Sequence, residues 1–236
     1  NSEVVMSNSN NTYAGTTRIH AGTLTVNGVL TPTSNNVVLT GAGSRLNGSG
    51  SINNRNVIVN SSASNAVIQG IHLIGPGAMT VATVGITVNA AGVTIGGAGT
   101  GEAVLVNNWD QGVHINGVKA SARILGSTLS PSVITGNRIG VDVLGGKAYI
   151  QHTDMSLNTA LRNDGISRGA GLRARGGARV DAGQGFGGYD FTGLNGGGVG
   201  QGSQGGNIFD GYSSHAASTV PTVAQAILNL NTNAPN

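Results

Sequence analysis

The feature that most constrains this chain is a repeat of short apolar strands in a fixed order. Four first strands align, and their leading glycines fall 27, 28 and 31 residues apart. A second strand-like segment follows each first strand, and a third recurs in three of the units. Three short strands in each unit of about 27 residues predict one coil of a parallel β-helix. The first strands are residues 85–88, 112–115, 140–143 and 171–174, the second are 93–95, 122–124, 148–150 and 178–180, and the third are 104–106, 132–135 and 159–162.

Strands this short favour a stacked fold for a physical reason. Side chains alternate between the faces of a strand, so Val113 and Ile115 point one way and His114 the other. A strand of three or four residues cannot bury its apolar face alone, whereas stacked coils bury that face against the coils above and below. An antiparallel sandwich would not repeat three different strands in one order. We therefore expect an all-β chain folded as a parallel β-helix, a solenoid of about 27 residues per coil.

The composition narrows the alternatives. The 41 glycines could indicate disorder, but 38% of the residues are hydrophobic and the net charge is only +3, which favours a folded chain with many tight turns. The absence of cysteine excludes disulfides and thiolate metal sites. The apolar residues are scattered, so no membrane-spanning run is predicted. The basic surplus is small and lacks a cluster with interleaved aromatic residues, so we predict no nucleic-acid partner; the nearest approach to one is Arg168, Arg173, Arg175 and Arg179.

We predict a single β-helix domain over residues 1–236, because no linker composition interrupts the repeat. Residues 11–75 contain the same kind of short strand-like segments at shorter spacing. Residues 80–182 form the regular three-strand coils. Residues 183–211 are glycine-rich and predict an insertion or surface loop. Residues 212–236 predict a short C-terminal cap or tail.

One stretch resembles a known family. Residues 11–28 (N-T-Y-A-G-T-T followed by G-T-L-T-V-N-G) resemble the autotransporter-associated β-strand repeat of bacterial passenger domains. Residues 85–185 are similar to the right-handed β-helix repeats of pectate-lyase-like proteins. The resemblance implies a right-handed coil, secretion or display on the bacterial cell surface, and a role in adhesion. It transfers no catalytic residues to this chain.

The alignment of the coils predicts a column of outward side chains formed by Thr87, His114, Asp142 and Arg173. His114, Asp142 and Arg173 are the candidate catalytic residues if the protein is a polysaccharide lyase or glycoside hydrolase, and the same face could bind a glycan. The alternative is a charge-paired ladder that modestly stabilises the stack. Glycoside hydrolysis generally needs two carboxylates, and this column contains one. We therefore favour a non-enzymatic role.

A second column is predicted from Thr94, Arg123, Tyr149 and Arg179, and it offers further positions for binding a glycan. Aromatic residues near the glycine-rich segment could cover the end of the core or stack on sugar rings. The candidate binding residues are Arg123, Tyr149, Arg179, Tyr189 and Tyr212.

Asparagines recur at one turn of the predicted coil. These are Asn107 or Asn108, Asn137 and Asn163. Amide side chains stacked along a solenoid can hydrogen-bond from coil to coil, and asparagine also tolerates a left-handed backbone. We predict that this ladder holds the turn.

Glycine pairs at nine-residue spacing in residues 183–211 resemble the pattern of calcium-binding β-rolls, but most of the expected carboxylates are missing. Asp190 and Asp210 are the acids available to a calcium site there, and we predict no metal or other cofactor.

Taken together, the sequence predicts a non-enzymatic structural or adhesin-like module, secreted or displayed on the cell surface. Its expected partners are extracellular glycans or a host or matrix surface. Self-association through the ends of the solenoid is a further expectation, since open solenoid ends need covering.

Overall fold

The computed structural model describes residues 2–31, 35–77, 82–158 and 170–182. Across these ranges the chain is all-β, and every paired strand lies in one of three parallel sheets. This arrangement is that of a parallel β-helix or solenoid, and it confirms the predicted fold class at that level. The predicted glycine-rich insertion (183–211) and C-terminal cap (212–236) lie outside the described residues.

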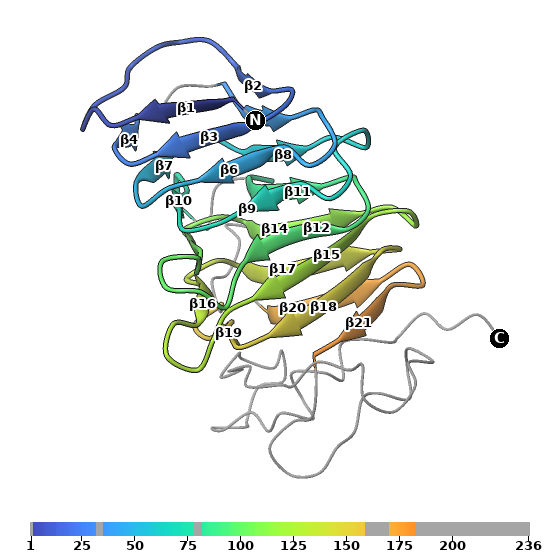
Figure 1. The fold of residues 1–236 in the computed structure, drawn as a ribbon. Helices are drawn as coiled ribbons and strands as arrows, with labels where there is room; N and C mark the ends of the chain where they lie inside the picture. The colour runs from blue at the N-terminus through green and yellow to red at the C-terminus, as the bar shows by residue number, and fades with distance from the viewer. Residues whose placement is uncertain (1, 32–34, 78–81, 159–169, 183–236) are drawn as a thin grey trace, which may run out of the picture.

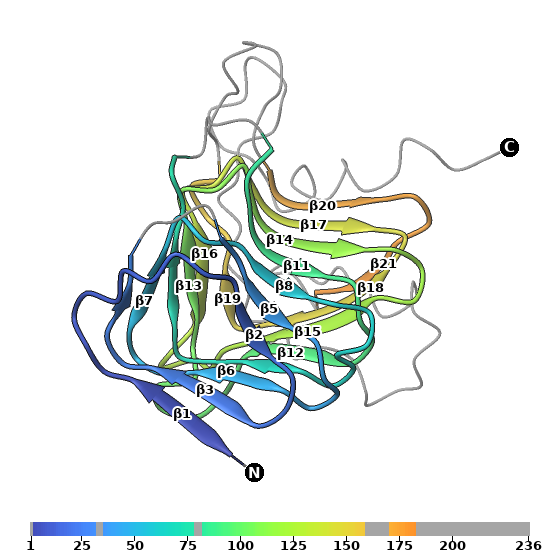
Figure 2. The same ribbon diagram turned by 90° about the horizontal axis from the view of Figure 1, so that it is seen from above.

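The three sheets are named here A, B and C, and Figure 2 shows them as three sides of the stack. Sheet A contains β1 (Glu3–Met6), β3 (Thr23–Val26), β6 (Arg45–Asn47), β9 (Val67–Ile68), β12 (Val93–Gly96), β15 (Ser121–Leu125), β18 (Lys147–Gln151) and β21 (Arg179–Asp181). Sheet B contains β4 (Val29–Leu30), β7 (Ser51–Asn53), β10 (His72–Ile74), β13 (Leu105–Asn107), β16 (Ser132–Thr135) and β19 (Thr153–Asp154). Sheet C contains β2 (Thr17–Ile19), β5 (Val37–Leu39), β8 (Val57–Val59), β11 (Val84–Val88), β14 (Gln111–Asn116), β17 (Ile139–Leu144) and β20 (Ala170–Arg175).

From β2 onward the chain visits the sheets in the order C, A, B and then begins again. Figure 1 shows the successive coils stacked along the chain. Each strand pairs in parallel with the strand of the same sheet in the next coil. The predicted unit of three different strands in fixed order is therefore confirmed for the described coils. The last predicted third strand, 159–162, lies outside the described residues, and the strand that pairs with β16 in sheet B is β19, six residues earlier.

The coils that follow Ile68 are longer than those at the N-terminal end. In sheet A, Leu24, Leu46 and Ile68 are register partners, and they lie 22 residues apart. From Ile68 onward the partners are Ile95, Ile124 and Ile150, which are 27, 29 and 26 residues apart. The shorter spacing predicted for the N-terminal third is thus found. The longer coils contain longer strands, since β14 and β17 have 6 residues each whereas β2, β5 and β8 have 3 each.

Apolar side chains of the same kind stack inside the coils. The six sheet A partners from Leu24 to Ile150 are all buried, and they belong to one hydrophobic cluster that extends from Ile19 to Leu172. Burying a side chain of this size contributes about 1.5–3 kcal/mol. No coil could bury its apolar residues alone, so this stabilisation exists only in the stack.

The leading glycines of the repeat form a column where sheet C begins. A β-carbon on Gly85, Gly112 or Gly140 would lie 2.5–2.7 Å from the carbonyl oxygen of the next glycine in the column. A bulky side chain also packs beside each of them, namely Trp109, Asn137 and Asn158 respectively. The repeated glycine is therefore required by close packing between coils.

Gly140→Ala should destabilise the protein by about 1–3 kcal/mol, because the new methyl group would overlap the Gly171 carbonyl and the Asn158 amide. Gly15→Ala is the matched control, since a β-carbon added to Gly15 would have no other atom within 4 Å. Urea unfolding of the two variants provides the measurement. Equal stability of the two variants would contradict the packing argument.

Candidate functional site

The predicted column on sheet C has the predicted register. Thr87 pairs with His114, His114 with Asp142, and Asp142 with Arg173, on neighbouring strands β11, β14, β17 and β20. Because Val141 and Val143 lie in the core cluster, Asp142 between them faces away from it. The Asp142 side chain is nevertheless completely buried.

Two arginines and one histidine surround the Asp142 carboxylate. Arg173 donates from Nε to Oδ1 at 2.8 Å and from Nη2 to Oδ2 at 3.0 Å. Arg175 donates from Nε to Oδ1 at 3.2 Å and from Nη2 to Oδ2 at 2.9 Å. His114 Nδ1 lies 3.0 Å from Oδ2. Both carboxylate oxygens are thus held by paired, bidentate contacts, which are the strongest hydrogen bonds that a carboxylate makes.

Arg175 is a member of this cluster that the sequence prediction missed. It lies two residues after Arg173 in β20, so the two side chains share a face of sheet C. The alternation of side chains along β20 could have identified Arg175. Leu172 and Ala174 are the apolar residues that face inward, so Arg173 and Arg175 both face outward.

The electrostatics of the cluster fix the charge of Asp142. Burial by itself would raise the pKa of Asp142, but the hydrogen bonds from His114, Arg173 and Arg175 outweigh it and hold the pKa far below its usual range. The hydrogen bond to Asp142 likewise raises the pKa of Arg175 against the opposing effect of burial. A general acid or base works best with a pKa near the operating pH. Asp142 is instead a permanent, fully bonded carboxylate.

Asp142→Asn should lower the free energy of unfolding at pH 7 by about 2–3 kcal/mol, because it leaves Arg173 and Arg175 close together without their shared counter-charge. The effect is smaller than for a fully buried pair, since the two arginines are 30% and 43% exposed. Urea unfolding of wild type and variant measures it.

The pH dependence follows from the depressed pKa of Asp142. The carboxylate contributes its full stabilisation above the unfolded-state pKa of about 3.9, and this contribution is lost as the pH falls below that value. The stability difference between wild type and Asp142→Asn should therefore shrink between pH 5 and pH 2. Asp154→Asn, which keeps the oxygen that accepts from the Ser156 amide, should change stability by less than about 1 kcal/mol. A difference that stays constant down to pH 2 would contradict the assignment.

The predicted second column is partly wrong. Thr94 pairs with Arg123 and Arg123 with Tyr149, as expected. Tyr149, however, pairs with Asp181, and Arg179 pairs with Lys147. The alignment was wrong by two residues, and because side chains alternate with a period of two, such a shift leaves the same residues facing outward. The apolar pattern therefore could not distinguish the two registers.

Two of the candidate binding residues interact directly with each other. The Arg123 guanidinium lies over the ring of Tyr149, with 5.1 Å between its central carbon and the ring centroid. Arg123 and Arg179 are exposed and Tyr149 is half-buried. The remaining binding candidates, Tyr189 and Tyr212, lie outside the described residues.

The predicted asparagine ladder is confirmed only at Asn137, because the place one coil earlier is taken by Trp109 rather than by an asparagine, and the third member also differs. Asn137 Oδ1 accepts from the Trp109 amide at 3.0 Å, and Asn158 Oδ1 accepts from the Asn137 amide at 2.9 Å. The rung after Asn137 is therefore Asn158, and Asn163 lies outside the described residues. The prediction missed this position because only residue 152 separates β18 from β19, whereas residues 126–131 separate β15 from β16.

Each rung of the ladder also caps a strand of sheet B. Asn137 Nδ2 donates to the Val106 carbonyl at 3.1 Å, and Asn158 Nδ2 donates to the Ile134 carbonyl at 2.6 Å. Trp109 takes the equivalent place one coil earlier, where its indole Nε1 donates to the Leu73 carbonyl at 3.3 Å. These buried side chains hold the turn between sheets B and C, which supports the structural interpretation.

One buried ion pair and one buried arginine were not foreseen from the sequence. Arg138 Nε donates to Asp110 Oδ1 at 2.5 Å and its Nη2 donates to Oδ2 at 3.1 Å, joining consecutive coils. Arg55 is completely buried and donates to the carbonyls of Thr31 at 3.0 Å, Tyr13 at 2.8 Å and Gly15 at 3.5 Å. The ion pair and Arg55 both stabilise turns that precede strands of sheet C, and their charged groups are hydrogen-bonded to the partners named above.

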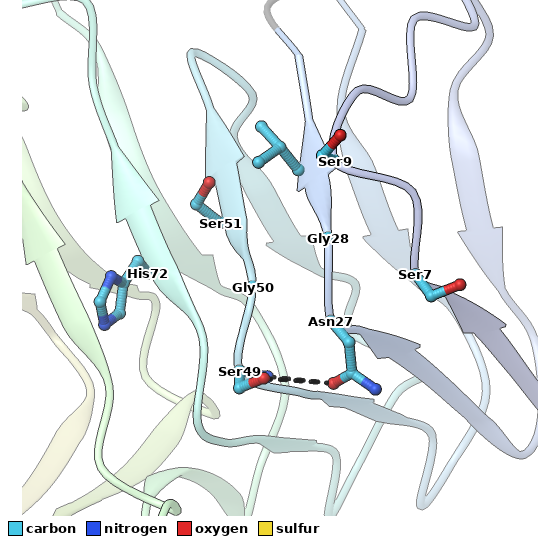
Figure 3. Close-up of a pocket in the computed structure, with 9 residues that line it drawn as sticks. Ser7, Ser9, Asn27, Gly28, Ser49, Gly50, Ser51 and His72 are labelled. Atoms are coloured by element: carbon cyan, nitrogen blue, oxygen red, sulfur yellow. Dashed lines mark hydrogen bonds between the residues drawn. The ribbon is translucent and has the colours of Figure 1, made fainter.

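A separate polar groove of about 370 Å³ lies along the turns and strands of sheet B in the N-terminal coils (Figure 3). In it, the Ser49 amide donates to Asn27 Oδ1 at 3.3 Å. His72 is the one titratable residue among its lining, so the groove offers hydrogen-bonding groups without an acid–base pair. Its lining residues are Ser7, Ser9, Asn27, Gly28, Val29, Ser49, Gly50, Ser51 and His72.

The calcium candidates Asp190 and Asp210 lie outside the described residues. Within residues 2–31, 35–77, 82–158 and 170–182, no group of three histidine, aspartate or glutamate side chains is placed to hold a metal ion. In the same ranges no helix is long and apolar enough to cross a membrane.

In comparisons with known proteins, the chain matches no protein-family model, no curated protein and no solved structure.

Proposed function

We propose that this protein is a non-enzymatic structural or adhesin-like module, secreted or displayed on a bacterial cell surface. The observation that carries the proposal is the state of Asp142. This acid occupies the middle of the outward column that carries the catalytic candidates His114, Asp142 and Arg173, yet both of its oxygens are bound by Arg173 and Arg175. A carboxylate held in this way stabilises the stack and exchanges no proton near neutral pH.

Within the described residues, one other acid is completely buried, and it leads to the same conclusion. Asp110 is bound by Arg138 through two hydrogen bonds, and Arg138 is itself buried. Neither acid is available to serve as the second carboxylate that glycoside hydrolysis generally requires.

The proposal includes a closed, right-handed coil. The support is general: a crossover between parallel strands of one sheet is right-handed in about 98% of cases. The resemblance of residues 11–28 to autotransporter repeats supports secretion and surface display. Within this stretch the carbonyls of Tyr13 and Gly15 accept hydrogen bonds from buried Arg55, which is consistent with a structural role for the motif.

The alternative function is a carbohydrate-active enzyme or glycan binder that uses the His114, Asp142 and Arg173 face. Arg173 and Arg175 are 30% and 43% exposed, which favours a glycan binder over an enzyme. Guanidinium groups can contact a ligand while they remain bonded to Asp142, whereas catalysis would need a group that gains and loses a proton.

Incubation with a panel of neutral and acidic polysaccharides, followed by assays for new reducing ends and for unsaturated products, should show no turnover. Immobilised glycan and matrix preparations should retain the labelled protein if it is an adhesin. Asp142→Asn serves as the matched variant for both measurements. Turnover that this variant abolishes while it remains folded by circular dichroism would overturn the proposal in favour of an enzyme.

A further inference from the structure

Half of the chain's basic residues gather on the last three described coils. Six of its 12 lysines and arginines lie on sheets A and C, or on the turns between them, from β14 to β21. We call this surface the basic face. Its residues are Lys119, Arg123, Lys147, Arg173, Arg175 and Arg179.

The cations of the basic face are accessible and its acids are not. Five of the six basic residues are exposed, and the sixth, Arg173, is partly exposed. The two acids on the sheet A and sheet C strands of these coils, Asp142 and Asp181, are both buried. The charge that this surface presents to solvent is therefore positive.

Two of these cations are direct neighbours. Lys147 of β18 and Arg179 of β21 are register partners, on strands about 4.8 Å apart. Like charges opposite each other destabilise a sheet. In the described part of the chain neither side chain has a carboxylate partner. An anion bound across the two strands would supply the missing counter-charge.

The Asp142 cluster continues the positive surface onto sheet C. One carboxylate is shared by two guanidinium groups there, so the cluster has a net charge of at least +1. Arg175 ends β20 and Arg179 begins β21, which places the two arginines at either side of one tight turn. The basic face therefore extends around the edge between sheets C and A.

The N-terminal coils lack this arrangement. Their exposed arginines, Arg18 and Arg45, lie on β2 and β6, which belong to different sheets. Neither of the two has a basic register partner, since Arg18 pairs with Val38, and Arg45 pairs with Thr23 and Val67. The concentration of charge is thus specific to one end of the described solenoid.

We propose that the basic face binds a linear acidic polysaccharide, one that carries carboxylate or sulfate groups along its length. This inference rests on the proposed function and specifies its ligand. A pair of cations in register on neighbouring coils, with further exposed cations on the strands beside it, suits a polymer with repeated charges. A single-stranded nucleic acid is less well matched, because it needs open aromatic rings for base stacking, and the Tyr149 ring is covered by Arg123.

The test compares two double variants that remove the same charge. Lys147→Gln with Arg179→Gln alters the basic face, and Arg18→Gln with Arg45→Gln is the control on the N-terminal coils. All four side chains are exposed, so both variants should fold, and thermal unfolding verifies this. Binding is measured by calorimetry and by salt elution with heparin, alginate, neutral dextran and polythymidylate as probes.

Wild type should bind heparin or alginate and should not bind dextran. The basic-face variant should bind the acidic polysaccharide at least about tenfold more weakly than wild type. The salt dependence of its binding should correspond to about two fewer released counterions. The affinity of the control variant should change by less than about twofold. Either acidic polysaccharide should also raise the melting temperature of wild type more than that of the basic-face variant.

Equal weakening in the two variants would overturn the inference, because net charge alone would then explain binding. Binding of polythymidylate as tight as that of heparin would overturn the choice of polysaccharide over nucleic acid. Failure to bind any acidic probe would overturn the inference and leave the proposed function standing, since that function fails only if Asp142-dependent turnover is found. If the double variant does not fold, Lys147→Gln alone replaces it and should weaken binding by a smaller factor.

Discussion

The parallel pairing of each coil with the next is the constraint on which the rest of this structure depends. It places like residues on like residues, so that Ile95, Ile124 and Ile150 bury one another in a continuous column. The same pairing determines which outward side chains become neighbours. The core and the candidate sites are therefore two consequences of one register, and an error in register would disturb both together.

The parts of the structure that repeat could be predicted from the sequence. The alignment of the coils predicted three strands per unit and the pairing of His114, Asp142 and Arg173. It placed Arg179 wrongly, because a shift of two residues preserves the inward and outward pattern. The Asn158 rung depends on turn length, which varies between coils and carries no periodic signal, so sequence alone could not locate it.

The candidate site shows how a solenoid can contain catalytic residue types without catalytic chemistry. The stacking that brings His114, Arg173 and Arg175 to Asp142 also saturates the carboxylate with four hydrogen bonds from the two arginines. Its negative charge is thereby neutralised within the protein, while part of the positive charge of the arginines still faces solvent. The arrangement favours electrostatic attraction at a surface over proton transfer in a cleft.

Buried Arg55 has a consequence for how the N-terminal end of the stack behaves. In an ideal solenoid each coil interacts only with its immediate neighbours, and the terminal coil can open independently of the rest. Arg55 reaches past the adjacent turn at Thr31 to the carbonyls of Tyr13 and Gly15, which are 42 and 40 residues away in the sequence. It therefore couples three successive turns through one side chain. The first coil can open only if it loses the hydrogen bonds that Arg55, two coils further along the chain, donates to Tyr13 and Gly15. The N-terminal coils therefore open as one cooperative unit.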